Sequence, residues 1–170
     1  MKKVIVIGCP GSGKSTFSKK LNELTGIALF HLDMMYWNKD KTTVAKNIFT
    51  QRLLNAMQND EWIIDGNYNS TMELRLKECD TVVFLDFPTD VCLNGVEQRK
   101  GKPRTDMPWT EKDPNEDFEF IEFIKNFNVQ TRPQIMKLLN EYSEKEILIF
   151  KTRAESDEFL KEISTSKTRI

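Results

Sequence analysis

The chain has 170 residues, of which 39% are hydrophobic and 30% are charged, and its formal net charge is −1. This length predicts a single domain over residues 1–170 with a full hydrophobic core. No apolar run approaches the ~20 residues of a membrane-spanning helix, and no basic excess indicates a nucleic-acid-binding face. Three cysteines without metal-ligand spacing predict free thiols and a cytoplasmic protein.

Apolar runs and helical patterns alternate along the chain. Strands are expected at Lys3–Ile7, Ile27–Phe30, Glu61–Ile64, Thr81–Leu85 and Glu146–Phe150. Helices are expected at Lys14–Leu24, Val44–Gln58, Thr71–Glu78, Thr89–Arg99, Phe118–Phe127, Ile135–Tyr142 and Ser156–Ile163. Pro133 predicts a break or kink near Arg132. The alternation predicts an α/β fold, in which a parallel sheet lies between two layers of helices.

Residues 100–115 interrupt this alternation, because they contain three prolines and no periodic apolar pattern. A loop of this length inside a compact domain is usually functional or disordered. Four basic residues gather around its start: Arg99, Lys100, Lys102 and Arg104. Arginine forms planar, bidentate contacts with phosphate. We therefore expect Arg99 and Arg104, together with Arg132 farther along, to neutralise charge during phosphoryl transfer.

Residues 8–15 carry the pattern G-x-x-x-x-G-K-[ST] between a predicted strand and a predicted helix. In this setting backbone N–H groups and the helix N-terminus converge on a phosphate, which predicts a nucleoside triphosphate site. Lys14 is expected to reach the β- and γ-phosphates, and the Ser15 hydroxyl to bind Mg²⁺. The predicted phosphate-binding residues are Gly8, Cys9, Pro10, Gly11, Ser12, Gly13, Lys14, Ser15 and Thr16.

Carboxylates follow three of the predicted strands, at the sheet edge where a ligand crevice is expected. Asp65 and Asp86 both stand where a carboxylate can support Mg²⁺, and Gly66 favours Asp65 because it lets a ligand approach closely. Asp33 is expected to orient or deprotonate an acceptor hydroxyl. The roles of base and metal ligand can be exchanged between Asp33 and Asp65.

Further residues near these carboxylates are candidates for the acceptor site. Tyr36, Trp37 and Tyr68 are placed to stack on an acceptor or enclose it, with core packing as the alternative. Arg75 is a candidate for a contact with an acceptor, and solvent exposure is its alternative. The predicted acceptor-binding residues are Asp33, Tyr36, Trp37, Gly66, Tyr68 and Arg75.

Together, the phosphate loop, Asp33, Asp65-Gly66 and the arginine-containing insertion resemble the adenylate-kinase-like nucleoside and small-molecule kinases. The resemblance implies a P-loop three-layer sandwich with five parallel strands in the order 2-3-1-4-5. It also implies ATP as the nucleotide, an acceptor-binding region at 33–60 and a lid at 100–117. In these kinases the loop after the fifth strand touches the adenine base, which makes Arg153 a nucleotide-site candidate.

A closer resemblance is to the bacterial DNA topology modulation proteins, the FlaR-like group. The segments that carry it are His31-Leu-Asp33, Tyr36-Trp37, Trp62-Ile-Ile-Asp-Gly-Asn-Tyr68, Phe84-Leu-Asp-Phe-Pro88, Arg104-Thr-Asp-Met107 and Thr131-Arg-Pro-Gln134. Adenylate kinases continue the Asp-Gly with Phe-Pro-Arg, whereas this chain has Asn67-Tyr68-Asn69. That departure argues against AMP as the acceptor.

The resulting hypothesis is a Mg-ATP-dependent kinase that phosphorylates a small acceptor, namely a nucleoside, a nucleotide or a hydroxylated metabolite. The alternative is a nucleotide-dependent regulator associated with DNA topology, or an NTPase without a small-molecule acceptor. The balanced charge of the chain speaks against direct DNA binding.

Overall fold

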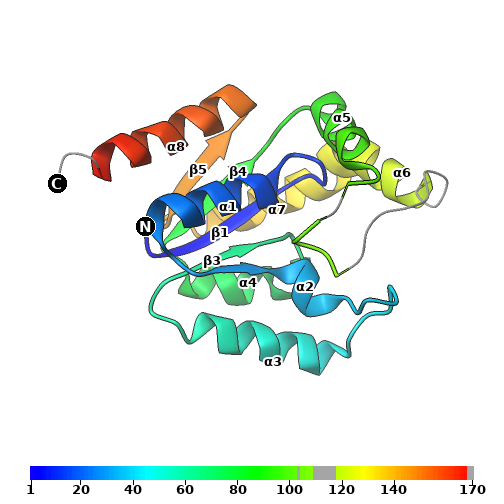
Figure 1. The fold of residues 1–170 in the computed structure, drawn as a ribbon, viewed down its shortest axis with the longest axis horizontal. Coiled ribbons are helices and arrows are strands. Elements are labelled where there is room, and N and C mark those ends of the chain that lie inside the picture. Colours follow the sequence, from blue (N-terminus) through cyan, green and yellow to red (C-terminus); the bar gives the residue numbers. More distant parts are fainter. Residues whose placement is uncertain (103, 109–117, 168–170) are drawn as a thin grey trace.

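A five-stranded parallel sheet forms the centre of the molecule (Figure 1). The computed structural model describes residues 1–102, 104–108 and 118–167. The strands are β1 (Lys3–Gly8), β2 (Leu29–His31), β3 (Trp62–Asp65), β4 (Thr81–Leu85) and β5 (Glu146–Phe150). They stand in the order β2-β3-β1-β4-β5, and every pair is parallel. The predicted fold class and strand order are confirmed.

Helices cover both faces of the sheet, with α1 and α8 on one face and α4 and α7 on the other (Figure 1). The helices are α1 (Lys14–Thr25), α2 (Leu32–Tyr36), α3 (Lys46–Met57), α4 (Asn69–Glu78), α5 (Thr89–Arg99), α6 (Phe118–Asn126), α7 (Arg132–Glu141) and α8 (Arg153–Lys167). None of the helices in the described ranges is long and apolar enough to span a membrane.

The hydrophobic core lies on both sides of the three central strands. Residues 4–7 of β1, 62–64 of β3 and 82–85 of β4 are almost completely buried. A parallel strand covered by helices on both faces needs apolar side chains at successive positions rather than at alternate ones. This requirement explains the uninterrupted apolar runs in the sequence, and it fixes the carboxyl ends of the strands at one edge.

Several boundaries differ from the prediction, and two of the differences affect the site. β2 ends at His31, and the short helix α2 follows at once, so Asp33 belongs to a helix that the sequence pattern did not predict. Helix α8 begins at Arg153 instead of Ser156. The predicted break near Arg132 is a π-helical turn (Phe127–Thr131) leading into α7, where proline occupies the first turn. Of the predicted lid, residues 103 and 109–117 lie outside the described residues.

Candidate active site

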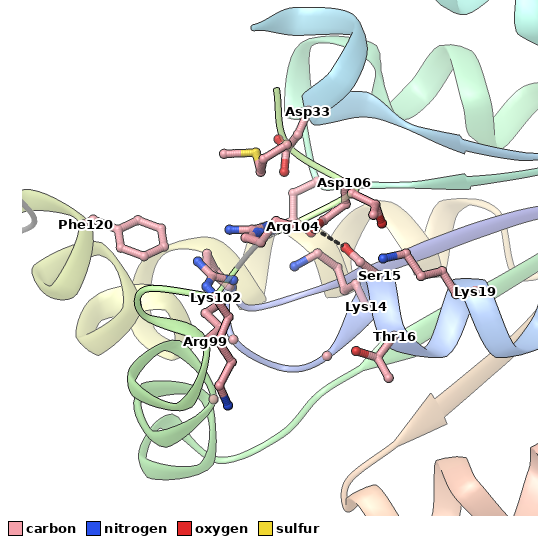
Figure 2. A pocket seen from close by; sticks show the side chains of 18 of the residues that line it. Lys14, Ser15, Thr16, Lys19, Asp33, Arg99, Lys102, Arg104, Asp106 and Phe120 are labelled. Carbon is pink, nitrogen blue, oxygen red and sulfur yellow. Dashed lines mark hydrogen bonds and ion pairs between the residues drawn. The ribbon is translucent and has the colours of Figure 1, made fainter. Parts of the chain in front are cut away.

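A cleft of about 1160 Å³ opens at the carboxyl ends of the strands. Its walls come from the phosphate loop after β1, helix α2, the loop after β3, helix α5 and residues 104–107 (Figure 2). In an open parallel sheet this edge is where ligands bind, because loops from neighbouring strands diverge there. The predicted residues that line the cleft are Pro10, Gly11, Gly13, Lys14, Ser15, Thr16, Asp33, Trp37, Gly66, Tyr68, Arg99, Arg104 and Arg153.

The phosphate loop packs directly on helix α5, and two glycines make this contact possible. A Cβ added to Gly11 would lie 2.0 Å from the carbonyl oxygen of Cys92, and one added to Gly95 would lie 2.1 Å from the carbonyl oxygen of Gly11. Gly11 and Gly13 also have positive φ values of 84° and 94°, which L side chains rarely adopt. Gly8, Cys9 and Ser12 do not line the cleft and form the back of the loop.

Lys14 lies over the phosphate loop and faces the cleft (Figure 2). Its Nζ donates hydrogen bonds to the carbonyl oxygens of Gly8, at 3.0 Å, and Cys9, at 3.2 Å. Burial lowers the pKa of Lys14, and the negative charges of Asp65 and Asp33 oppose that shift. The two carboxylates thus favour the ammonium form that a phosphate contact requires.

Asp33 enters the cleft from α2 and accepts a hydrogen bond from the hydroxyl of Tyr68, at 2.6 Å. Burial raises the pKa of Asp33, whereas the Tyr68 hydrogen bond and the charge of Lys14 act in the opposite direction. A carboxylate with a raised pKa accepts a proton more readily than an ordinary aspartate. Asp33 is therefore a cleft carboxylate whose burial favours proton uptake.

The three aromatic residues predicted for the acceptor site form one cluster, but only two of them line the cleft. Trp37 and Tyr68 contribute to the wall. Tyr36 packs behind them, with ring centroids 5.2 Å from Trp37, 5.0 Å from Tyr68 and 5.2 Å from Phe49. The core-packing alternative therefore describes Tyr36, whereas Trp37 and Tyr68 offer apolar surface to a ligand.

Asp65 lies behind the cleft, at the end of β3. It is only 4% exposed, and its Oδ1 is 2.8 Å from Nδ1 of His31. Among the described residues its Oδ2 has no hydrogen-bond partner. Asp65 is absent from the cleft wall, but it acts on Lys14 through its charge. Its role as a metal ligand stays a prediction.

Asp106 is the site residue that the sequence reasoning missed. Its Oδ2 accepts a hydrogen bond from the Ser15 hydroxyl at 2.7 Å, drawn as a dashed line in Figure 2. Arg104 donates to both of its oxygens, at 3.1 Å from Nε and 2.7 Å from Nη2. Burial raises the pKa of Asp106, but the hydrogen bonds from Arg104 and Ser15 outweigh it and hold the pKa well below its usual range. The only signal in the sequence was the motif Arg104-Thr-Asp-Met107.

Arg99, Arg104 and Arg153 reach the cleft from three different elements. The guanidinium of Arg99 lies 5.7 Å from the ring centre of Phe120 on α6. That of Arg153 lies 5.7 Å from the ring centre of Phe87 and donates to the carbonyl oxygen of Gly11 at 3.3 Å. These cation–π contacts hold the guanidinium groups of Arg99 and Arg153 at the cleft wall.

Arg132, expected among these arginines, is absent from the cleft wall. Its Nε donates to Asp86 Oδ1 at 2.8 Å and its Nη2 to Asp86 Oδ2 at 2.8 Å. Lys151 binds the same carboxylate. Asp86 therefore links the starts of α7 and of the β5–α8 connection, and Arg132 acts here as a structural ion-pair partner.

Arg75, expected to contact an acceptor, is completely buried and does not line the cleft. Its guanidinium donates to the carbonyl oxygens of Gly66, at 2.9 Å, Tyr68, at 3.2 Å, and Asn67. Burial lowers the pKa of Arg75 to about 9. Its N–H donors hold the loop after β3 in place. Arg75 therefore has a structural role here, in place of the direct acceptor contact that we expected.

The strand order and the glycine-rich loop between β1 and α1 define a P-loop α/β fold, in which such a loop binds the phosphates of a nucleotide. A family model described as an AAA domain matches residues 4–122, and the chain therefore belongs to that family. No curated protein sequence matches the chain significantly.

Solved structures share the fold at low sequence identity. A shikimate kinase from Acinetobacter baumannii, in complex with shikimate, has 16% identity and a TM-score of 0.64, covering 99% of this chain and 94% of its own. A sugar kinase from Janibacter sp. has 12% identity and a TM-score of 0.56, with 97% and 93% covered. A shikimate kinase from Aquifex aeolicus has 19% identity and a TM-score of 0.53, with 97% and 95% covered.

Proposed function

We propose that the chain is an ATP-dependent kinase that transfers the γ-phosphoryl group to a hydroxyl of a small molecule. The observation that carries this proposal is that Lys14 and Asp33 face the same cleft from opposite walls (Figure 2). One supplies positive charge at the phosphate loop, and the other is a carboxylate with a raised pKa. Phosphoryl transfer needs this combination of charge neutralisation and an oriented nucleophile.

In the proposed reaction the acceptor hydroxyl gives its proton to Asp33 while its oxygen bonds to the γ-phosphorus. The bond from that phosphorus to the bridging oxygen breaks, and ADP leaves. Lys14, Arg99 and Arg104 stabilise the charge on the transferring group. Ser15 would hold Mg²⁺ together with the phosphates, because hydroxyl, carboxylate and phosphate oxygens are the ligands that this ion prefers. The metal would neutralise charge on the β- and γ-oxygens.

The burial of Arg75 favours a hydroxylated acceptor over one that is itself a phosphate ester. In the loop after β3 its donors are used by backbone carbonyl groups, so they do not offer a phosphate-binding fork. The neutral residues of the cleft wall on the side of Asp33 include Trp37, Gly66, Asn67 and Tyr68, and Lys41 adds one positive charge. Aromatic rings and an amide suit a hydroxylated compound such as a sugar or a nucleoside, and a cation beside them also admits a hydroxylated ring acid.

ADP formation from Mg-ATP, measured against a panel of sugars, nucleosides, nucleotides and hydroxy acids including shikimate, tests the proposal. Strong stimulation by one compound, with a phosphorylated product and no activity in Lys14→Ala, is the expected result. Slow hydrolysis that no compound stimulates would overturn it in favour of an NTPase. DNA, added to the same assay at several salt concentrations, tests the DNA-topology alternative, for which steep salt dependence is the signature.

A further inference from the structure

A carboxylate oxygen stands directly beside the hydroxyl that is expected to bind Mg²⁺. Asp106 Oδ2 and Ser15 Oγ are 2.7 Å apart, although the two residues are 91 positions apart in the chain. Asp106 is 6% exposed, so the contact is an enclosed one rather than a chance encounter of surface side chains. Ser15 is the second residue of helix α1, at the predicted phosphate site.

The separation of these two oxygens matches the edge of a Mg²⁺ coordination octahedron. Mg²⁺ binds oxygen ligands at about 2.0–2.1 Å in near-ideal octahedral geometry, which places neighbouring ligands roughly 2.9 Å apart. Ser15 Oγ and Asp106 Oδ2 therefore need little rearrangement to share one ion. Both belong to the hard oxygen donors that Mg²⁺ selects.

The other carboxylates near the phosphate loop are less well placed for this task. Among the described residues that line the cleft, Asp33 and Asp106 are the only acidic ones. Asp33 accepts the Tyr68 hydroxyl on the acceptor side. Asp65, the sequence-based choice, lies behind the wall and contacts His31. Of the carboxylates in the described ranges, Asp106 is the one that combines a place in the cleft wall with a contact to Ser15.

Arg104 supplies the positive charge that a carboxylate in this position needs. It donates to both oxygens of Asp106 in a bidentate pair, which is the strongest geometry for an arginine and a carboxylate. A divalent cation at Oδ2 would replace part of this neutralisation. The Nη2 donor of Arg104 could then turn to the triphosphate, where a transferred phosphoryl group needs it.

We propose that Asp106 is a ligand of the nucleotide-bound Mg²⁺, beside Ser15, so that the metal joins residues 104–108 to the phosphate loop. This inference rests on the nucleotide-binding part of the proposed function. Without the metal, the Asp106 carboxylate faces the negative triphosphate and opposes its binding. Removing this charge should weaken metal binding while leaving metal-free nucleotide binding equal or stronger. A purely structural Asp106 would not produce these opposite effects.

Mn²⁺ titration followed by electron paramagnetic resonance, with a non-hydrolysable ATP analogue present, tests this assignment. Asp106→Asn is expected to weaken Mn²⁺ binding by about 10-fold or more, while analogue binding in EDTA does not fall. Asp106→Glu, which keeps a carboxylate, should retain more affinity than Asp106→Asn. Asp90→Asn, an exposed aspartate on α5, is the matched control and should match wild type.

Mn²⁺ affinity that is unchanged in Asp106→Asn, or lost only in Asp65→Asn, would overturn the assignment. A wild-type protein that binds neither the analogue nor its Mn²⁺ complex would instead contradict the proposed function itself. Thermal melting verifies that each variant is folded. If Asp106→Asn does not fold, Asp106→Ser takes its place with the same expected results.

Discussion

Asn67 holds the first residue of the phosphate loop by both of its backbone polar groups. Its Oδ1 accepts from the Gly8 N–H at 3.1 Å, and its Nδ2 donates to the Gly8 carbonyl oxygen at 2.9 Å. The loop after β3 is itself fixed by Arg75. A continuous chain of hydrogen bonds therefore runs from α4 through the loop after β3 to the glycine-rich loop.

Replacing Asn67 with alanine should weaken nucleotide binding without unfolding the protein. The substitution removes two hydrogen bonds from a part-buried position, each worth roughly 0.5–1.5 kcal/mol. We expect nucleotide affinity, measured by isothermal titration calorimetry, to fall by about 5- to 150-fold. Asn69→Ala, an exposed neighbour two residues on, is the control. Equal affinity in Asn67→Ala and the control would show that the pair with Gly8 does not order the loop.

Gly95→Ala should distort the phosphate loop, although Gly95 belongs to helix α5 and is far from the loop in the sequence. The new Cβ would lie 2.1 Å from the carbonyl oxygen of Gly11, so loop and helix α5 must separate. Overpacking of this kind typically costs about 1–3 kcal/mol. Both the melting temperature and the nucleotide affinity should fall, whereas Asn94→Ala on the exposed side of α5 should leave the affinity unchanged. Wild-type affinity in Gly95→Ala would refute the close packing of α5 on the loop.

The pH dependence of turnover should report the ionisation of Asp33. A general base works only when deprotonated, so the rate falls as the pH drops through its pKa. That pKa is raised by burial and lowered by the Tyr68 hydrogen bond. Tyr68→Phe removes the lowering contact, so the acid limb of the kcat profile should move to higher pH. A limb that stays in place, or moves to lower pH, would argue against Asp33 as the base.

Arg75→Met should destabilise the fold strongly because it leaves carbonyl groups of the loop after β3 without their donors. A buried acceptor that loses its partner costs roughly 1–3 kcal/mol. We expect the free energy of unfolding in urea to fall by about 2–4 kcal/mol. Lys77→Met, an exposed position on the same helix, should change it little. A stable Arg75→Met variant whose defect is confined to the acceptor KM would restore the direct contact that the sequence suggested.

Local patterns in the sequence predicted most of the fold, including the glycine-rich loop between β1 and α1. The uninterrupted apolar strands, the glycine-rich turn and Lys14 are neighbours in the chain, so spacing alone reveals them. Arg75 was misjudged because a charged residue on a helical pattern usually indicates an exposed face. Its partners are backbone carbonyl groups, which every residue has, so the residue types in the sequence do not reveal this contact.

Asp106 was missed for a different reason. Its partner Ser15 is 91 residues away, and only the folded chain brings residues 104–108 over the phosphate loop. Arg132 was expected to bind phosphate because it is an arginine, but Asp86, which follows β4, neutralises its charge. Contacts between residues far apart in the chain decided both cases, and no short spacing in a single sequence reveals such contacts.

Phosphate transfer by Asp33→Asn, compared with wild type on the acceptor that the panel identifies, tests the central claim most directly. The substitution keeps the shape of the side chain and removes its basicity. We predict that acceptor-dependent ADP formation falls by about 100-fold or more, while the affinity for the ATP analogue is retained. Acceptor-dependent transfer at the wild-type rate in Asp33→Asn would contradict the account.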